Sequence, residues 1–175
     1  MRTEFKVSLN SYLAGSTNQN GVNSLSDLIS FNDKNAPTVM PYFQQEQLIA
    51  AEATNGVDDP KYIQAMKECH RLTRGEGIDK VLSDYSCCSL VAPTISTPWA
   101  IDLLNGDNRL GGSSCLAAVS GYPSVTLPMG YVSGLPVGLS FIGGAWEDHS
   151  IIDLAYAFEQ TALVRQPPGH PARFL

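Results

Sequence analysis

The chain has 175 residues, of which 43% are hydrophobic, so it can bury a sizeable core and is expected to form a single domain, 1–175. A formal net charge of −6, without any run of lysine or arginine, argues against nucleic acid or an anionic membrane as a partner. The apolar runs are too short to span a bilayer, and no signal peptide precedes the first predicted helix. A cytoplasmic protein is therefore expected, although a longer parent protein could carry a signal.

Helical patterns fill the first half of the chain. The clearest start is Pro60, which suits the first helical position after a capping Asp58 or Asp59, and Gly75 is expected to end that helix. Ser24, with an acid three residues later, forms a variant of the capping box. These signals, together with apolar spacing and propensity, predict helices at residues 4–14, 24–31, 44–54, 60–74 and 78–85, with a loop at 32–41.

The second half alternates strands and helices. Its two main strands are apolar on both faces, which is typical of a sheet covered by helices. Pro128 is expected to close the first of them, and Ser133-Gly134 supplies the turn into the second. A serine at 113 or 114 and Asp148 are expected to cap helices. The pattern predicts an α/β fold with strands at 88–92, 124–127 and 135–142, helices at 115–120 and 148–162, an irregular segment at 94–112 and an extended tail at 166–175.

Neither the cysteines nor the histidines show metal-ligand spacing. The four cysteines include no C-x-x-C pair, and the three histidines lie far apart in the sequence. We therefore expect free, buried or half-buried thiols in a reducing compartment, no metal site and no cofactor. Among the larger side chains, Met129, Tyr131 and Phe141 are expected in the core, and Trp146 is expected to pack and not to bind a ligand.

Residues 113–143 carry a specific resemblance. The stretch SSCLAAVSGYPSVTLPMG, followed by GLPVGLSFIG, resembles the C-terminal signature of the amidase signature family. The similarity extends to LVAPT at 90–94 and to AWEDHSIIDLAYAFEQTALVRQPP at 145–168, and it covers nearly the whole chain. It implies the C-terminal portion of the amidase signature fold, which is an α/β fold with a mixed β-sheet flanked by helices.

The resemblance also implies a mechanism. Members of the family hydrolyse carboxamide C–N bonds with a lysine, a serine on a cis peptide and a nucleophilic serine, while backbone N–H groups hold the oxyanion. None of these elements matches a position in this chain, and none of its five lysines has the family's lysine context. The chain therefore resembles the C-terminal third of an amidase, without catalytic residues. The stretch Gly111–Ser114 looks superficially like the nucleophile region, but we interpret it as a tight loop and helix cap.

The segment from residue 94 to residue 107 is the better candidate for a functional site. It follows the end of a strand, where α/β sheets place ligands, and the family resemblance implies that this region shapes the substrate pocket. Thr94 and Trp99 are accordingly predicted to line the pocket. In the alternative interpretation, Trp99 packs on the core and Asp102 caps a turn.

Three functions are consistent with this sequence. The first is the C-terminal part of an amidase that acts on small-molecule amides. The second is part of the glutamine-hydrolysing subunit of a tRNA-dependent amidotransferase. The third is an autonomous, non-catalytic binding or assembly module. In each case the chain alone is expected to be inactive, and its uncovered strand edge is expected to make it self-associate.

Overall fold

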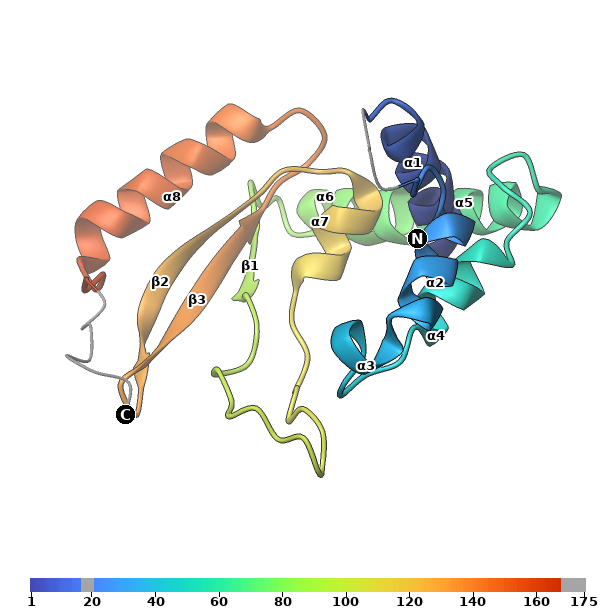
Figure 1. The fold of residues 1–175 in the computed structure, drawn as a ribbon. Helices are drawn as coiled ribbons and strands as arrows, with labels where there is room; N and C mark the ends of the chain where they lie inside the picture. The colour runs from blue at the N-terminus through green and yellow to red at the C-terminus, as the bar shows by residue number, and fades with distance from the viewer. Residues whose placement is uncertain (17–20, 168–175) are drawn as a thin grey trace. The chain divides into compact units, whose positions relative to one another are not determined.

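The computed structural model describes residues 1–16 and 21–167 (Figure 1). By its internal contacts the chain divides into two compact units, Met1–Lys67 and Glu68–Leu175. The single domain expected from the chain length stays a prediction. Residues 168–175 of the expected extended tail lie outside the described residues. No helix within the described ranges combines the length and the apolar character that crossing a membrane requires.

The first unit consists of helices with well-marked starts. The Ser24 hydroxyl accepts a hydrogen bond from the Asp27 N–H at 3.1 Å and donates to the Asp27 carboxylate at 2.8 Å, as the capping pair predicts. Asp59 accepts from the Lys61 N–H at 2.8 Å, so the second of the two candidate aspartates caps the helix that starts at Pro60. The helices are α1 (Arg2–Ala14), α2 (Leu25–Lys34), α3 (Ala36–Val39), α4 (Glu46–Glu52) and the first part of α5 (Pro60–Thr73).

The prediction of a loop at 32–41 is wrong. Helix α2 continues to Lys34, and α3 follows after one residue. Pro37 lies in the first turn of α3, where its missing N–H has no intrahelical partner to lose. Asn35 joins the two helices, because its side-chain amide donates to the Phe31 carbonyl at 2.8 Å. Proline therefore starts a helix here and does not break one.

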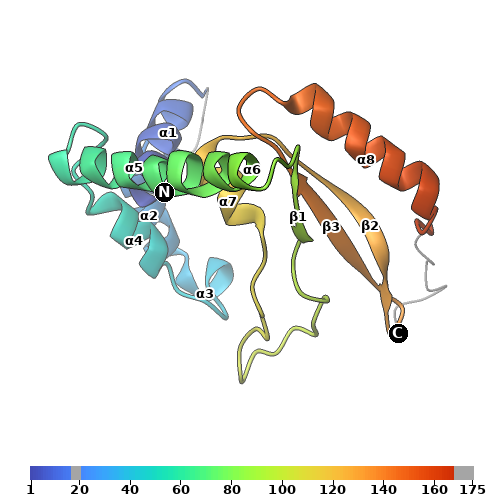
Figure 2. The same ribbon diagram turned by 180° about the vertical axis from the view of Figure 1, so that it is seen from behind.

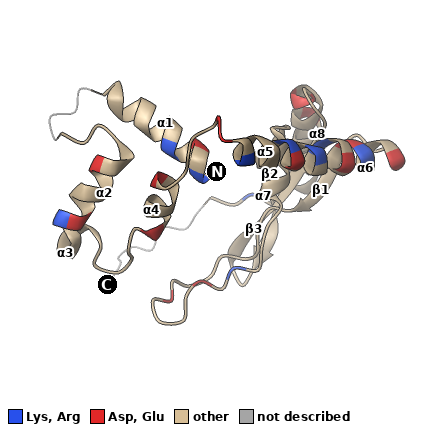
Figure 3. Cartoon of the chain, turned by 90° about the vertical axis from the view of Figure 1, so that its right-hand side faces the viewer, with Lys and Arg blue, Asp and Glu red and all other residues tan. Residues whose placement is uncertain are grey.

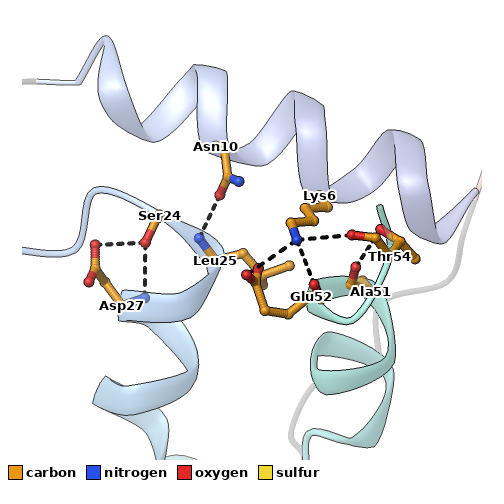
Figure 4. A network of polar contacts seen from close by, with 8 residues as sticks. All are labelled: Lys6, Asn10, Ser24, Leu25, Asp27, Ala51, Glu52 and Thr54. Atoms are coloured by element: carbon orange, nitrogen blue, oxygen red, sulfur yellow. Dashed lines mark hydrogen bonds and ion pairs between the residues drawn. The ribbon is translucent and has the colours of Figure 1, made fainter. Parts of the chain in front are cut away.

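Polar contacts join α1 to α2 and α4 (Figure 4). The Lys6 ammonium donates to the carbonyls of Glu52 and Thr54, the latter at 3.1 Å, and lies 3.3 Å from the Glu52 carboxylate. Those carbonyls lie at the C-terminal end of α4, where a positive charge complements the helix dipole. Asn10 accepts a hydrogen bond from the N–H of the fully buried Leu25 at 2.7 Å. Together these contacts fix how the three helices pack.

Replacing Lys6 with methionine is expected to destabilise the first unit. Methionine keeps the apolar stem but leaves two carbonyls and the Glu52 carboxylate without their cation, and one oxygen of that carboxylate is already buried without a partner. Loss of such a partner costs about 1–3 kcal/mol. Urea unfolding followed by circular dichroism should show a lower midpoint, and hydrogen exchange should accelerate in α1 and α4. The matched change Lys67→Met, at an exposed residue of α5, should leave both measurements unchanged.

The second unit begins with the end of α5, and the helical path does not stop at Gly75 as expected. It passes through a π-helical turn, η1 (Arg74–Ile78), and breaks its regular angles at Gly77, with φ −108° and ψ −105°. A Cβ at Gly77 would lie 2.4 Å from the Leu72 carbonyl oxygen, so the turn needs glycine for this close approach. The remaining elements are α6 (Asp79–Asp84), β1 (Leu90–Pro93), α7 (Ser114–Ser120), β2 (Ser124–Val132), β3 (Leu135–Ile142) and α8 (Asp148–Ala162).

The three strands form an antiparallel sheet in the order β1-β3-β2. Strand β3 has the predicted bounds, and Ser133-Gly134 makes the predicted turn with positive φ at both residues, 51° and 79°. The prediction that β2 ends at Pro128 is wrong, because the strand continues to Val132. The pairing register shifts between Pro128 and Gly130, so the proline sits at a β-bulge, where its missing N–H is tolerated.

Helix α8 packs on one face of this sheet and completes an α/β unit of the predicted class (Figures 1 and 2). Its buried Ile151 and Ala155 meet Phe141 of β3, whose ring lies 5.6 Å from that of Phe158. The predicted core position of Phe141 is thus confirmed. Strands β2 and β3 contain no charged residue (Figure 3). Asp148 begins α8, but the helix has no side-chain cap, so the capping role expected for this residue is wrong.

The cysteines are free, as expected, but all four are exposed. The prediction of buried thiols is wrong, because Cys87 and Cys88 lie in the connection between α6 and β1, and Cys69 and Cys115 face outward from helices. Within the two described ranges, no three histidine, cysteine or acidic side chains are placed to share a metal ion.

Candidate functional site

Three hydroxyl groups fasten the start of the candidate segment to the sheet. The Thr94 hydroxyl lies 2.8 Å from that of Ser140 on β3, and Ser140 lies 2.9 Å from Thr126 on β2. Thr94 also donates to Thr126 at 3.3 Å. Gly138 leaves room for this cluster, since a Cβ there would lie 2.7 Å from the Thr94 hydroxyl oxygen. Because Thr126 and Ser140 alternate with residues that face α8, the cluster lies on the opposite face of the sheet.

The segment 94–112 is a loop whose two ends pair with each other. Ile95 and Gly112 form an isolated antiparallel bridge, and the Ser96 N–H donates to the Gly111 carbonyl at 3.2 Å. A Cβ at Gly112 would lie 2.6 Å from a carbonyl of the facing segment, so the close approach requires glycine. The long irregular loop predicted here is confirmed, and these contacts close its base.

Hydrogen bonds also organise the outer part of this loop. The Trp99 indole N–H donates to the Asp107 carboxylate at 3.1 Å. Asp102 accepts hydrogen bonds from the N–H groups of Leu104 and Asn105, each at 2.9 Å, and these bonds, with that from the Asn105 side chain, lower the pKa of Asp102. Asp102 therefore caps a turn, as one of its two interpretations predicts. Trp99 is half-buried and lies outside the buried core cluster.

An open groove of about 500 Å³ lies between this loop and the β2–β3 hairpin. Its walls are mostly apolar and include Ile95, Leu110, Met129, Val132 and Val137. Met129 was expected in the core, but the bulge in β2 leaves it 36% exposed on the groove. The proline next to it in the sequence is the signal that could have located this bulge.

The two predicted pocket residues occupy different parts of the loop. Thr94 lies at its base and directs its hydroxyl to Thr126 and Ser140, while Trp99 lies in its outer part against Asp107. Neither residue is among those that line the groove, and no hydrogen bond joins them within the described chain. Their role in a substrate pocket stays a prediction.

The Gly111–Ser114 stretch lacks the partners of a nucleophile. The Ser113 hydroxyl is buried without a hydrogen-bond partner, and Ser114, the first residue of α7, is exposed. No acidic or basic side chain in the described ranges hydrogen-bonds to either serine, so no general base is in place. Helix α7 ends at Gly121 with φ 74°, as predicted, but it starts without a side-chain cap. The expected serine cap is therefore wrong.

Known proteins resemble this chain over most of its length, although no protein-family model matches it. A protein of Arabidopsis thaliana whose name is "Probable amidase" is 34% identical over 94% of the chain and 29% of its own length. The X-ray structure of native peptide amidase from Stenotrophomonas maltophilia superposes with a TM-score of 0.86, at 42% identity, over 96% of this chain and 33% of that one. A glutamyl-tRNA(Gln) amidotransferase subunit from Natranaerobius thermophilus is 36% identical over 62% of this chain and 22% of its own.

The extent of these matches supports one assignment. The two amidases match nearly the whole chain, and the solved one shares its fold, whereas the amidotransferase subunit matches a shorter stretch. The chain spans about a third of the length of the amidases it matches. Sequence and fold together show that the chain belongs to the amidase signature family.

Proposed function

We propose that this chain is the C-terminal part of an amidase that hydrolyses carboxamide C–N bonds to a carboxylate and ammonia or an amine. The observation that carries the proposal is the similarity to peptide amidase, at 42% identity over 96% of the chain. The expected catalytic lysine and serines match no position here, so they would come from the remaining two-thirds of the protein. There, a serine would attack the amide carbonyl while the lysine and second serine move its proton towards the leaving amine.

The contribution of this chain would be to shape the substrate pocket. The loop 94–112 has a fixed base, because Thr94 is held by the hydroxyl cluster and Ile95 pairs with Gly112. Its outer part offers the half-buried Trp99, and the groove beside it offers an apolar wall. Apolar walls with a few fixed polar groups are the usual composition of small-molecule sites. We expect this region to contact the acyl part of the amide.

A chimera tests the proposal directly. In the Stenotrophomonas peptide amidase, the third that aligns with this chain is replaced by residues 1–175, and ammonia release from a peptide amide is measured. We expect saturable hydrolysis, whereas the peptide amidase without that third should be inactive. A chimera that is soluble and folded but hydrolyses no amide would count against an amidase role and in favour of the non-catalytic module.

The glutamine-hydrolysing part of an amidotransferase is the second candidate. The similarity to the Natranaerobius thermophilus protein favours it, but that match covers 62% of the chain against 96% for the peptide amidase. The same chimera separates the two functions when glutamine and a peptide amide are offered in competition. Preferred release of ammonia from the peptide amide supports the stand-alone amidase, and preferred use of glutamine supports the amidotransferase.

Replacing Trp99 with alanine in the chimera is expected to change substrate choice more than chemistry. Loss of the indole would widen the pocket, and apolar pocket contacts typically discriminate between substrates by about 1–3 kcal/mol. The measurement is the ratio of kcat/KM for peptide amides with small and large acyl groups. Tyr156→Ala, an aromatic truncation on the exposed face of α8, is the matched control and should leave the ratio unchanged. Constant ratios with a lowered melting temperature would instead assign Trp99 a packing role.

A further inference from the structure

A second cavity of the same unit shares no lining residue with the groove beside the loop. It holds about 400 Å³, which is within the range of small-molecule sites. Its walls come from three places in the sequence: the π-helical turn η1, the connection from α7 to β2, and the connection from β3 to α8. Arg74, Tyr122, Trp146 and Asp148 are the lining residues with chemically distinctive side chains.

Arg74 presents a fixed guanidinium group to this cavity. Its Nε donates to the Ser120 carbonyl at 2.7 Å, and its Cζ lies 5.7 Å from the centroid of the Tyr122 ring. Tyr122 is itself held, because its hydroxyl donates to the Asp79 carboxylate at 2.9 Å. The two terminal nitrogens of Arg74 have no hydrogen-bond partner in the described part of the chain. A planar guanidinium with both terminal nitrogens free is suited to bidentate binding of a carboxylate.

Trp146 lies at the rim of the cavity in an unusual backbone conformation. Its φ of 65° falls in the left-handed region, which is rare for a bulky residue, and its side chain is 94% exposed. The expectation that Trp146 packs is therefore wrong, and packing does not account for its backbone. Strained residues of this kind concentrate at ligand sites. Trp146 thus contributes a large aromatic surface to a cavity that the Arg74 guanidinium also lines.

Asp148 supplies the opposite charge. Its carboxylate is exposed and forms no ion pair or hydrogen bond within residues 1–16 and 21–167. Two further acids are nearby and already have partners, because Asp79 accepts a hydrogen bond from the Tyr122 hydroxyl and Glu147, next to Asp148 in the sequence, accepts one from the Ser150 hydroxyl at 2.7 Å. A simple anion would gain the attraction of Arg74 but would face the repulsion of Asp148. A ligand that carries both a carboxylate and an ammonium group satisfies both side chains.

From this arrangement we propose that the cavity binds a small zwitterion, namely an α-amino acid with an aromatic side chain. The carboxylate binds the terminal nitrogens of Arg74, the ammonium group binds Asp148, and the ring packs on the indole of Trp146. The proposal does not depend on the amidase function, because it concerns binding by this chain alone. The cavity is open, so affinity in the millimolar range is expected.

Calorimetric titration of the 175-residue chain with L-phenylalanine tests the proposal. We expect saturable binding, with affinity weaker by at least about tenfold for 3-phenylpropanoate, which lacks the ammonium group, and for L-phenylalaninamide, which lacks the carboxylate. Glycine, which lacks the ring, should also bind more weakly. In a Trp99→Phe background Trp146 is the only tryptophan, so its fluorescence should change with the same saturation curve. Absence of saturable binding, or equal affinity for phenylalanine and 3-phenylpropanoate, overturns the proposal.

Charge variants sharpen the result. Arg74→Gln should abolish phenylalanine binding, and Arg74→Lys, which keeps the charge without the planar fork, should weaken it. Asp148→Asn should weaken phenylalanine binding but strengthen that of 3-phenylpropanoate, because the repulsion is removed. Arg71→Gln is the matched control, since Arg71 is exposed, pairs with Glu68 and Glu76, and does not line the cavity. If Arg74→Gln fails to fold, Asp148→Asn decides, and unchanged affinities for both ligands overturn the proposal.

Discussion

The isolated chain is expected to release no ammonia from benzamide-type, aliphatic or peptide amides. The family mechanism needs a lysine, a bridging serine and a nucleophilic serine, and no residue here matches them. Two of the lysines have structural partners, since Lys6 binds the C-terminal end of α4 and Lys80 pairs with Asp84. Removal of the catalytic residues from a serine hydrolase costs on the order of a million-fold in turnover. Ammonia release by the pure chain should therefore equal the buffer blank.

The two serines of the Gly111–Ser114 stretch provide the control for this prediction. Neither Ser113 nor Ser114 hydrogen-bonds to an acidic or basic side chain in the described ranges, so Ser113→Ala and Ser114→Ala should change nothing. Saturable turnover that either substitution abolishes would contradict the prediction. It would also overturn the interpretation of this stretch as a loop and helix start. In the active chimera the same two substitutions should leave amide hydrolysis intact, because the nucleophilic serine would lie outside residues 1–175.

The isolated chain is also expected to self-associate at micromolar concentration. Strand β2 pairs only with β3, so its outer edge has no partner strand in the described chain. The strand is nine residues long and contains no charged residue, and charge is a common means by which edge strands avoid pairing. Val132 on β2 and Leu135 on β3 are 52% and 43% exposed. Light scattering after size exclusion should give a mass above that of the monomer, and a hydrophobic dye should bind.

A pair of lysine substitutions identifies the surface involved. Val132→Lys places a charge on the edge strand β2 and should reduce the fraction of the chain that self-associates. Ile152→Lys replaces a similarly exposed apolar residue on α8 and should have less effect. If deletion of residues 1–14 restores the monomer while Val132→Lys does not, exchange of helix α1 is the mode of association. A clean monomer without dye binding would contradict the prediction and favour an autonomous module.

Local signals in the sequence located most of the elements correctly. The Ser24 cap, the Asp59–Pro60 helix start, the Gly121 helix end and the Ser133-Gly134 turn all form as predicted. Each depends on hydrogen bonds and backbone angles within about four residues, so the neighbouring sequence suffices to specify it. The family was also identified from one continuous stretch, and the comparisons with known amidases confirm it.

Some of the wrong predictions depend on the surroundings. Pro128 was expected to end a strand and Gly75 a helix, but β3 pairs with β2 beyond the proline, and the π-helical turn continues past the glycine. At Pro128, pairing with a distant strand overrides the local preference of a breaker residue, whereas near Gly75 the break in the helical angles falls two residues later, at Gly77. The prediction that Trp146 packs failed for a related reason, because a hydrophobic side chain is buried only when the fold supplies a partner surface.

The sequence by itself determined the family, the α/β class and the position of the candidate loop, because these follow from contiguous residues and their periodicity. Only the tertiary structure decided which side chains meet. Thr94, Thr126 and Ser140 form one hydroxyl cluster although they are up to 46 positions apart, and Arg74 meets Ser120 at the same separation. Such contacts depend on strand register and helix packing, which sum many weak interactions between distant segments, so no short stretch of sequence encodes them.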